Sequence, residues 1–253
     1  MLLSTLTLWH RDIVRFLRQR SRIVGALGTP LVFWGMLGSG LGSSFSSESV
    51  SAGGYLAYFF PGTLALIVLF TAIFSTISLI EDRQTGFLQG VLVAPAPRAA
   101  IVLGKLLGGT TLAVLQAGLF LLLAPVAGID LALDAIPAIL GVLALLGFAL
   151  TGLGFLIAWW LDSSQGFHAI MNLLLVPMWV LSGAVFPAAG AAAWVRGAMA
   201  VNPMTYGVSA LQTLMIGRTD GPPLGLAVVV TVAFGLAMLG ASAWIVGSRR
   251  GTV

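Results

Sequence analysis

Six long stretches of the chain carry no charged side chain. They occupy residues 23–47, 55–80, 106–129, 135–161, 169–187 and 224–247. An α-helix rises about 1.5 Å per residue, so about 20 apolar residues cross the hydrocarbon core of a membrane. Each stretch reaches or nearly reaches that length. The pattern predicts an all-α integral membrane protein, a single domain over 1–253, with six transmembrane helices at 23–45, 55–80, 106–129, 135–161, 169–187 and 224–247.

The N-terminal residues form an amphipathic pattern. Apolar side chains recur at spacings of three or four, and basic ones fall on the opposite face. The apolar set is Leu2, Leu6, Trp9, Ile13, Phe16 and Leu17, and the basic set is Arg11, Arg15, Arg18 and Arg22. This predicts a helix within 1–22 at the inner membrane interface, with its arginines toward lipid phosphates. The simpler alternative is a basic topogenic signal without that orientation.

Residues 188–223 combine apolar composition with charges and a break. They include Arg196, Arg218 and Asp220, and Asn202-Pro203 is typical of a capped helix start. The pieces 188–200 and 203–216 are too short to span a bilayer. We therefore expect an outer re-entrant helical hairpin between spans five and six.

The basic residues set the predicted orientation. Ten of the twelve Lys and Arg residues fall on one side of these spans. Positively charged loops resist translocation, so both termini are expected in the cytoplasm, in a cytoplasmic (inner) membrane. The basic pI then reflects topology and contact with anionic lipid, and it implies no nucleic-acid partner.

The sequence lacks the residues that several classes of catalytic and metal-binding site require. Charged residues make up only 8% of the chain and cysteine is absent, so thiolate metal sites and thiol nucleophiles are excluded. No charge lies in the middle of a predicted span, which argues against ion-coupled transport. His10 and His168 are too far from Ser39 for a serine protease, and no H-E-x-x-H occurs. We expect no enzyme, no metal and no cofactor bound by this chain.

The most polar internal stretch is 81–98. Phe87, Leu88, Val91 and Leu92 form one apolar face on a short helix that Pro95 closes. That face is expected either to dock on a partner or to pack against the protein's own spans. Glu81, Asp82 and Arg83 are either ordinary interfacial charges or form salt bridges that hold this segment or reach a partner. We call residues 81–98 the coupling segment.

The motifs in and around this segment resemble those of one transporter family. Glu81-Asp82-Arg83, Gly86-Phe87-Leu88, Leu92-Val93-Ala94-Pro95, Arg98 and Gly104-Lys105 match permeases of the type-2 ATP-binding-cassette exporters, with the daunorubicin-resistance-like branch the nearest. Phe60-Pro61-Gly62 and Asn202-Pro203-Met204-Thr205-Tyr206 fit the same pattern. The resemblance implies a dimer of permeases on two ATPase subunits. In that family the apolar face of the coupling segment seats in a groove of the ATPase.

The sequence itself has no G-x-x-x-x-G-K-[ST] motif, so ATP and Mg²⁺ would bind a partner chain. The predicted function is therefore the permease of an ATP-driven exporter of an amphipathic, lipid-like or glycan cargo. The alternatives are a membrane scaffold or assembly factor, and a passive channel or scramblase. Gly38 and Gly42 provide a close-contact pair for a homodimer. The candidate cargo-pathway residues are Trp34, Phe70, Phe74, Met178 and Trp179, although such side chains more often serve helix packing or lipid contact.

Overall fold

The computed structural model describes residues 2–40, 54–93, 97–217 and 221–248. Within these ranges every regular element is helical, as the apolar pattern predicts. The helices are α1 Leu2–Arg18, α2 Arg20–Gly40, α3 Gly54–Ser75, α4 Ile77–Gln84, α5 Phe87–Val93, α6 Arg98–Leu121, η1 Ala124–Ala127, α7 Ile136–Trp160, α8 Ser164–Trp179, η2 Val180–Ala184, η3 Ala188–Gly190, α9 Ala193–Val201, α10 Pro203–Ile216 and α11 Leu224–Ser248.

Six helical stretches are long and apolar enough to cross a membrane. They are Ile23–Gly40, Gly54–Gln84, Arg98–Leu121, Ile136–Trp160, Ser164–Ala184 and Leu224–Ser248. The prediction of six transmembrane helices in an all-α protein is therefore confirmed. The third helix begins at Arg98 rather than at 106 and ends at Leu121 rather than at 129, because the chain turns through η1 before the next span. This shift brings Lys105 inside the third spanning helix.

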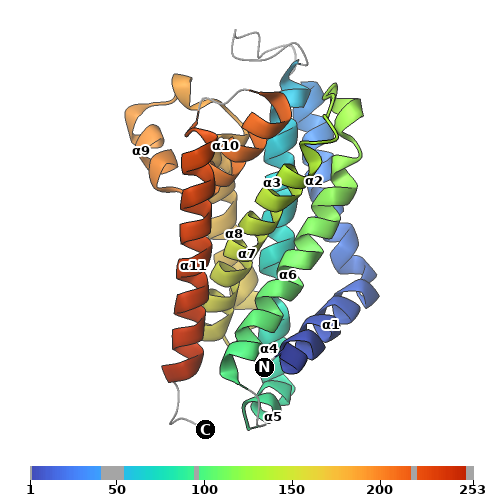
Figure 1. The fold of residues 1–253 in the computed structure, drawn as a ribbon, viewed down its shortest axis with the longest axis vertical. Helices are drawn as coiled ribbons and strands as arrows, with labels where there is room; N and C mark the ends of the chain where they lie inside the picture. Colours follow the sequence, from blue (N-terminus) through green and yellow to red (C-terminus); the bar gives the residue numbers. More distant parts are fainter. Residues whose placement is uncertain (1, 41–53, 94–96, 218–220, 249–253) are drawn as a thin grey trace.

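The bundle is built around α3 (Figure 1). Its residues between Tyr55 and Ile73 are almost all buried, and it packs against α2, α6, α7 and α10. By contrast, α2 and α11 expose most of their apolar surface. An apolar helix that lies on the outside of the bundle needs lipid or another protein around it. The arrangement is that of a membrane protein with one buried central helix.

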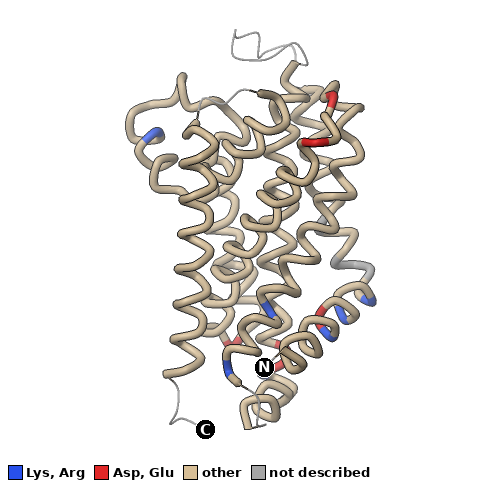
Figure 2. Tube along the Cα trace, in the orientation of Figure 1, with Lys and Arg blue, Asp and Glu red and all other residues tan. Residues whose placement is uncertain are grey.

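The two ends of the bundle differ in composition. Figure 1 shows α1, α4, α5 and the C-terminal end of α11 at one end, and α9 and α10 at the other. Figure 2 shows that most charged residues gather at the end with α1 and α4. We call this the α1 end and the opposite one the α9 end. The sequence pattern predicts that the α1 end is cytoplasmic.

The predicted helix break at Asn202-Pro203 is present. α9 ends at Val201 and α10 begins at Pro203, and the Asn202 side chain accepts a hydrogen bond from the Met204 backbone N–H at 3.0 Å. Proline at the first helical position lacks only an N–H that would have no partner inside the helix. α10 is largely buried against α3, α7 and α11.

Candidate functional site

The coupling segment folds as the end of α4, a turn and α5. Gly86 turns the chain between the two helices with φ at +77°, a left-handed conformation that glycine adopts at little cost. Residues 94–96, which include the predicted closing residue Pro95, lie outside the described residues. Figure 1 shows α5 at the extreme of the α1 end, beyond the spanning helices. A short helix is therefore presented at the end where the charges gather.

The apolar face of α5 packs against the protein itself. Leu88 is 5% exposed and belongs to the hydrophobic core, and Val91 and Leu92 pack against that core. The second of the two sequence alternatives describes this face. Phe87, the fourth residue of the predicted face, is instead 38% exposed, and Val93 is 82% exposed. Burial of Leu88 anchors α5 to the spans and leaves the opposite surface open.

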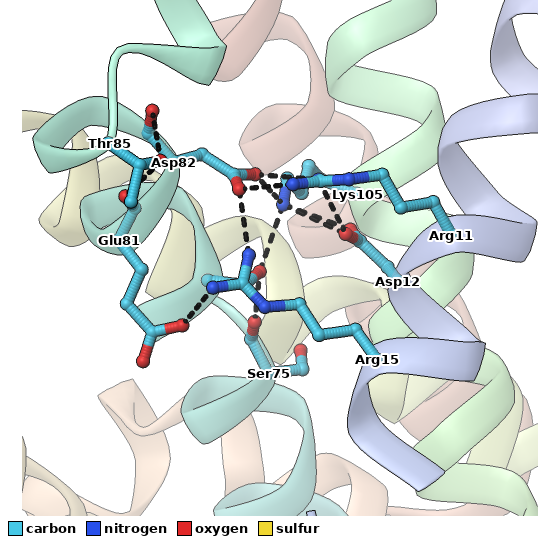
Figure 3. Close-up of polar contacts among 9 residues, drawn as sticks. Arg11, Asp12, Arg15, Ser75, Glu81, Asp82, Thr85 and Lys105 are labelled. Carbon is cyan, nitrogen blue, oxygen red and sulfur yellow. Dashed lines mark hydrogen bonds and ion pairs between the residues drawn. The ribbon is translucent and has the colours of Figure 1, made fainter. Parts of the chain in front are cut away.

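Asp82 is the centre of an ion-pair cluster between α1 and α4 (Figure 3). Its carboxylate is almost completely buried and accepts two hydrogen bonds from Arg11, at 2.7 and 3.1 Å. Arg15 donates to the same carboxylate at 2.7 Å and to Glu81 at 2.7 Å. Arg11 therefore binds Asp82 bidentately, and Arg15, one turn further along α1, bridges Asp82 and Glu81, so both hold α4 through charge-assisted bonds. The prediction that these arginines face lipid phosphates is corrected, because the two carboxylates at the end of the second span take them.

Lys105 extends the cluster to α6. Its ammonium is 5% exposed and lies 2.8 Å from Asp82 and 3.0 Å from Asp12, and it donates to the Ser78 hydroxyl at 2.9 Å. All of these partners come from α1 and α4. We call Arg11, Asp12, Arg15, Glu81, Asp82 and Lys105 the charge cluster.

Two glycines of α6 let α1 come close enough to form this cluster. A Cβ at Gly104 would lie 2.9 Å from the Leu8 Cβ, and one at Gly108 would lie 3.4 Å from the Asp12 Cβ. Glycines four residues apart give a groove into which a second helix fits. The Trp9 indole also donates to the Thr111 hydroxyl at 3.0 Å. α1 is therefore packed on α6 directly.

The charge cluster contains three cations and three carboxylates. Burial raises the pKa of Asp12, because loss of hydration outweighs the attraction of Lys105. The hydrogen bond with Asp82 raises the pKa of Arg11. Buried ion pairs cost desolvation that their attraction roughly offsets, so their main effect is on geometry. The cluster fixes where α1 lies relative to α4 and α6.

Arg83 fastens the other side of α4. It donates to the Trp159 carbonyl at 2.7 Å, to the Leu161 carbonyl at 3.2 Å and to Asp162 at 2.7 Å. The last carbonyls of a helix lack partners within the helix and carry partial negative charge, so a guanidinium there is favourable. Arg83 therefore caps α7 at Trp159. Of the sequence alternatives for Glu81 and Arg83, the structure shows salt bridges within the chain.

Sequence reasoning missed most of this cluster. It left Glu81 and Asp82 as either interfacial charges or salt-bridge residues, and it treated Lys105 only as part of a motif. Two signals were available: the spacing of Arg11, Asp12 and Arg15 on one helix, and, elsewhere in the chain, Lys105 inside an apolar run. Oppositely charged groups that occur in apolar surroundings are usually paired. Among the residues that the structure describes, no group of three His, Cys, Asp or Glu side chains could hold a metal ion.

The candidate cargo-pathway residues do not form one surface. Trp34 and Trp179 are buried, each in edge-to-face contact with other aromatic rings, and Trp179 donates to the Gly62 carbonyl at 2.8 Å. Phe70 and Phe74 form a half-buried pair with ring centroids 5.3 Å apart. Met178 is also half-buried. In the described part of a single chain, the two tryptophans form part of the helix packing.

Comparison with known proteins supports the reading of the bundle. The ABC-2 type transporter family matches residues 4–216. Nodulation protein J of Rhizobium leguminosarum bv. trifolii is 27% identical over 219 residues, 85% of this chain and 82% of that protein. Nodulation protein J of Neorhizobium galegae is 25% identical over 221 residues, 86% and 83% of the two chains. A transport permease of Cyanophora paradoxa is 28% identical over 162 residues, 63% and 56%.

The fold and these similarities define a multi-pass membrane transporter subunit that is not itself an enzyme. The chain belongs to the ABC-2 type transporter family, whose members are membrane subunits without nucleotide-binding motifs. The resemblance of the chain to this family is thereby confirmed, while the daunorubicin-resistance-like branch stays a prediction.

Proposed function

We propose that this chain is the permease of an ATP-driven exporter. Two copies of it work with two copies of a separate ATP-binding-cassette ATPase, and the ATPase contacts the permease at α5 and moves it during its cycle. ATP and Mg²⁺ bind the ATPase in this proposal. The main support for this proposal is the position of α5, which is exposed at one end of the bundle while its other side packs against the spanning helices. Leu88 anchors it in the core, and the charge cluster holds the adjoining helix α4.

This arrangement makes α4 and α5 a lever. A displacement of α5 would pass through Asp82 to α1 and α6, and through Arg83 to the end of α7. Short, charge-assisted bonds to helices resist separation, so the four helices move together. The docking residues are then the exposed ones, Phe87, Gln89, Gly90 and Val93. The buried Leu88 and the half-buried Val91 and Leu92 hold the lever in place.

The experiment uses Val93→Asp. Val93 is 82% exposed, so the substitution should leave folding intact, and a carboxylate in an apolar contact with the ATPase should weaken that contact by several kcal/mol. We expect the ATPase to copurify with the native permease and to be lost, or to hydrolyse ATP without export, in the variant. Leu133→Asp is the control, because Leu133 is 84% exposed at the other end of the bundle. A Val93→Asp complex with native composition and native export would refute docking at α5, and a native permease that binds no ATPase would favour the scaffold.

We further propose a homodimer. The apolar faces of α2 and α11 are largely uncovered in the single chain, and a second copy could cover part of that surface. Gly38, the described member of the predicted glycine pair, faces Leu56 of its own chain, and Gly42 lies outside the described residues. Gly38 therefore packs α2 on α3. The mass of the intact detergent complex should correspond to two permeases for two ATPases, and one permease per ATPase pair would contradict the dimer.

The proposed orientation puts the α1 end in the cytoplasm, across a cytoplasmic (inner) membrane, with α1 at the interface and α9 and α10 on the outer side. The distribution of the basic residues supports it. The chain has no cysteine, so single cysteines give an unambiguous readout. In cells, Ala193→Cys should react with a membrane-impermeant maleimide and Thr85→Cys only after lysis. Labelling in the reverse order would overturn the orientation.

The cargo would be amphipathic, lipid-like or glycan in nature. Phe70, Phe74 and Met178, all half-buried, are the candidates that a pathway between two copies could use.

A further inference from the structure

The α9 end contains a cavity that the transport mechanism proposed above does not use. It has a volume of about 240 Å³ and lies between η2, α9 and α10. Its lining includes Ser182, Arg196, Met199, Thr205, Tyr206 and Gln212. A water molecule takes about 30 Å³ of the liquid, so the cavity is large enough for a small organic group.

Hydrogen bonds hold the wall of this cavity in shape. α8 ends in a π-turn at η2, where Gly183 has φ at +82° and the regular helical hydrogen bonds are interrupted. The freed carbonyls are taken by side chains: Tyr58 donates to the Gly183 carbonyl at 2.9 Å, and Asn202 donates to the Leu181 carbonyl at 3.0 Å. Single π-turns within helices occur frequently at functional sites. The cavity is therefore formed before any ligand arrives.

Gln212 offers an acceptor inside the cavity. The residue is 5% exposed, and its amide nitrogen donates to the Gly183 carbonyl at 3.2 Å. That bond fixes which end of the amide is the oxygen, since only the nitrogen can donate. The Oε1 atom accepts no hydrogen bond from the residues that the structure describes. This oxygen is not fully buried, so it is an acceptor available to a ligand that carries a hydrogen-bond donor.

The hydroxyls beside Gln212 are also acceptors. Ser182 donates its proton to the Trp179 carbonyl at 2.5 Å, and Thr205 donates to the Leu181 carbonyl at 3.3 Å. A hydroxyl whose single proton is used can only accept further bonds. The inner part of the cavity therefore calls for donors on the ligand and would repel an anionic group.

Arg196, on α9, favours an anionic group on the ligand, in contrast to the acceptors near Gln212. It is exposed, and among the described residues that line the cavity it is the only charged one. It forms no ion pair with any residue in the described part of the chain. A guanidinium offers five N–H donors that match a carboxylate or a phosphate. An acidic group is thus favoured at Arg196 and disfavoured beside Gln212.

We propose that this cavity binds an anion that carries hydroxyl groups, with its acidic group on Arg196 and a hydroxyl donating to Gln212. An ammonium is a poorer donor here, because no described residue of the lining is a carboxylate and a buried ammonium needs one. Two sources share this chemistry: a sugar acid in solution, and the phosphoglycerol headgroup of phosphatidylglycerol in the adjacent leaflet. The site does not depend on an ATPase partner, and it can be tested without one.

The experiment measures both sources on the purified full-length chain. Binding of glucuronate, glucose and acetate is followed by saturation-transfer NMR in nanodiscs of phosphatidylcholine. In parallel, native mass spectrometry compares the retention of phosphatidylglycerol and phosphatidylethanolamine. We expect glucuronate to bind about tenfold more tightly than glucose or acetate, or phosphatidylglycerol to be retained in preference, since each lost hydrogen bond weakens binding by about that factor.

The variants locate the site. Arg196→Gln and Gln212→Met should each reduce the preferred binding about tenfold. Arg18→Gln, an exposed arginine at the α1 end, should not. Because Arg196 is exposed, its variant should fold normally even if Gln212→Met does not. Preference for a hydroxylated anion that Arg196→Gln abolishes supports the proposal for whichever source shows it. No preference among the probes, equal binding by Arg196→Gln, or an equal loss in Arg18→Gln overturns it.

Discussion

Replacing Lys105 with methionine is expected to destabilise the folded protein by about 3–5 kcal/mol, the usual cost of removing one partner from a buried ion pair. Lys105 is 5% exposed and is the close cationic partner of Asp12, whose other basic neighbour, Arg11, lies 3.6 Å away and bonds to Asp82. Without the ammonium, the Asp12 carboxylate stays buried with little compensation. The loss corresponds to a fall in Tm on the order of 10 °C for a chain of this size, measured on the detergent-purified protein.

A second substitution separates charge from packing. Asp12→Asn removes the carboxylate that Lys105→Met leaves behind, while Asp82 keeps Arg11 and Arg15. The double variant should therefore recover most of the lost Tm, because no buried charge is left without a partner. If the double variant is as unstable as Lys105→Met alone, the lysine acts through packing and the charge cluster does not explain its burial.

The transmembrane helices were predictable because hydrophobicity acts over whole segments. A helix that crosses a bilayer needs about 20 apolar residues whatever lies beside it, so six such stretches predict six helices. The break before α10 was also predictable, since Asn202 and Pro203 determine a helix start by local hydrogen bonding alone. These features need no knowledge of which helices touch.

The charge cluster was not predictable in the same way. Asp82 lies 71 residues from Arg11 and 23 from Lys105 in the sequence, and nothing local indicates that they meet. Their proximity follows from how α1 crosses α6 at Gly104 and Gly108, which is a property of tertiary packing. The apolar face of α5 illustrates the same limit. The sequence shows that Leu88 lies on such a face, and only the structure shows that its own core covers it.

Two carboxylates in and beside the coupling segment allow the role of burial to be measured directly. Asp82 and Asp162 each accept a 2.7 Å bond from an arginine, Arg11 and Arg83 respectively. They differ in surroundings, because the Asp82 side chain is 2% exposed and that of Asp162 is 87% exposed. Substitution by asparagine removes the charge and nearly preserves the shape. The two aspartates therefore allow an ion pair of the same length to be compared in a buried and in an exposed environment.

Asp82→Asn should cost about 3–5 kcal/mol, because Arg11, Arg15 and Lys105 would converge on a neutral amide with only Asp12 and Glu81 left to balance them. Asp162→Asn should cost at most about 1 kcal/mol, as is usual for an ion pair with one partner in water. Thermal unfolding of the two purified variants measures this difference.

The same two variants also test the lever formed by α4 and α5. Release of α1 from α4 in Asp82→Asn should lower export more than ATP hydrolysis, whereas Asp162→Asn should leave the ratio of export to hydrolysis unchanged. Equal Tm values would show that the buried cluster does not hold α1, and an equal ratio of export to hydrolysis in both variants would show that it does not transmit motion from α5.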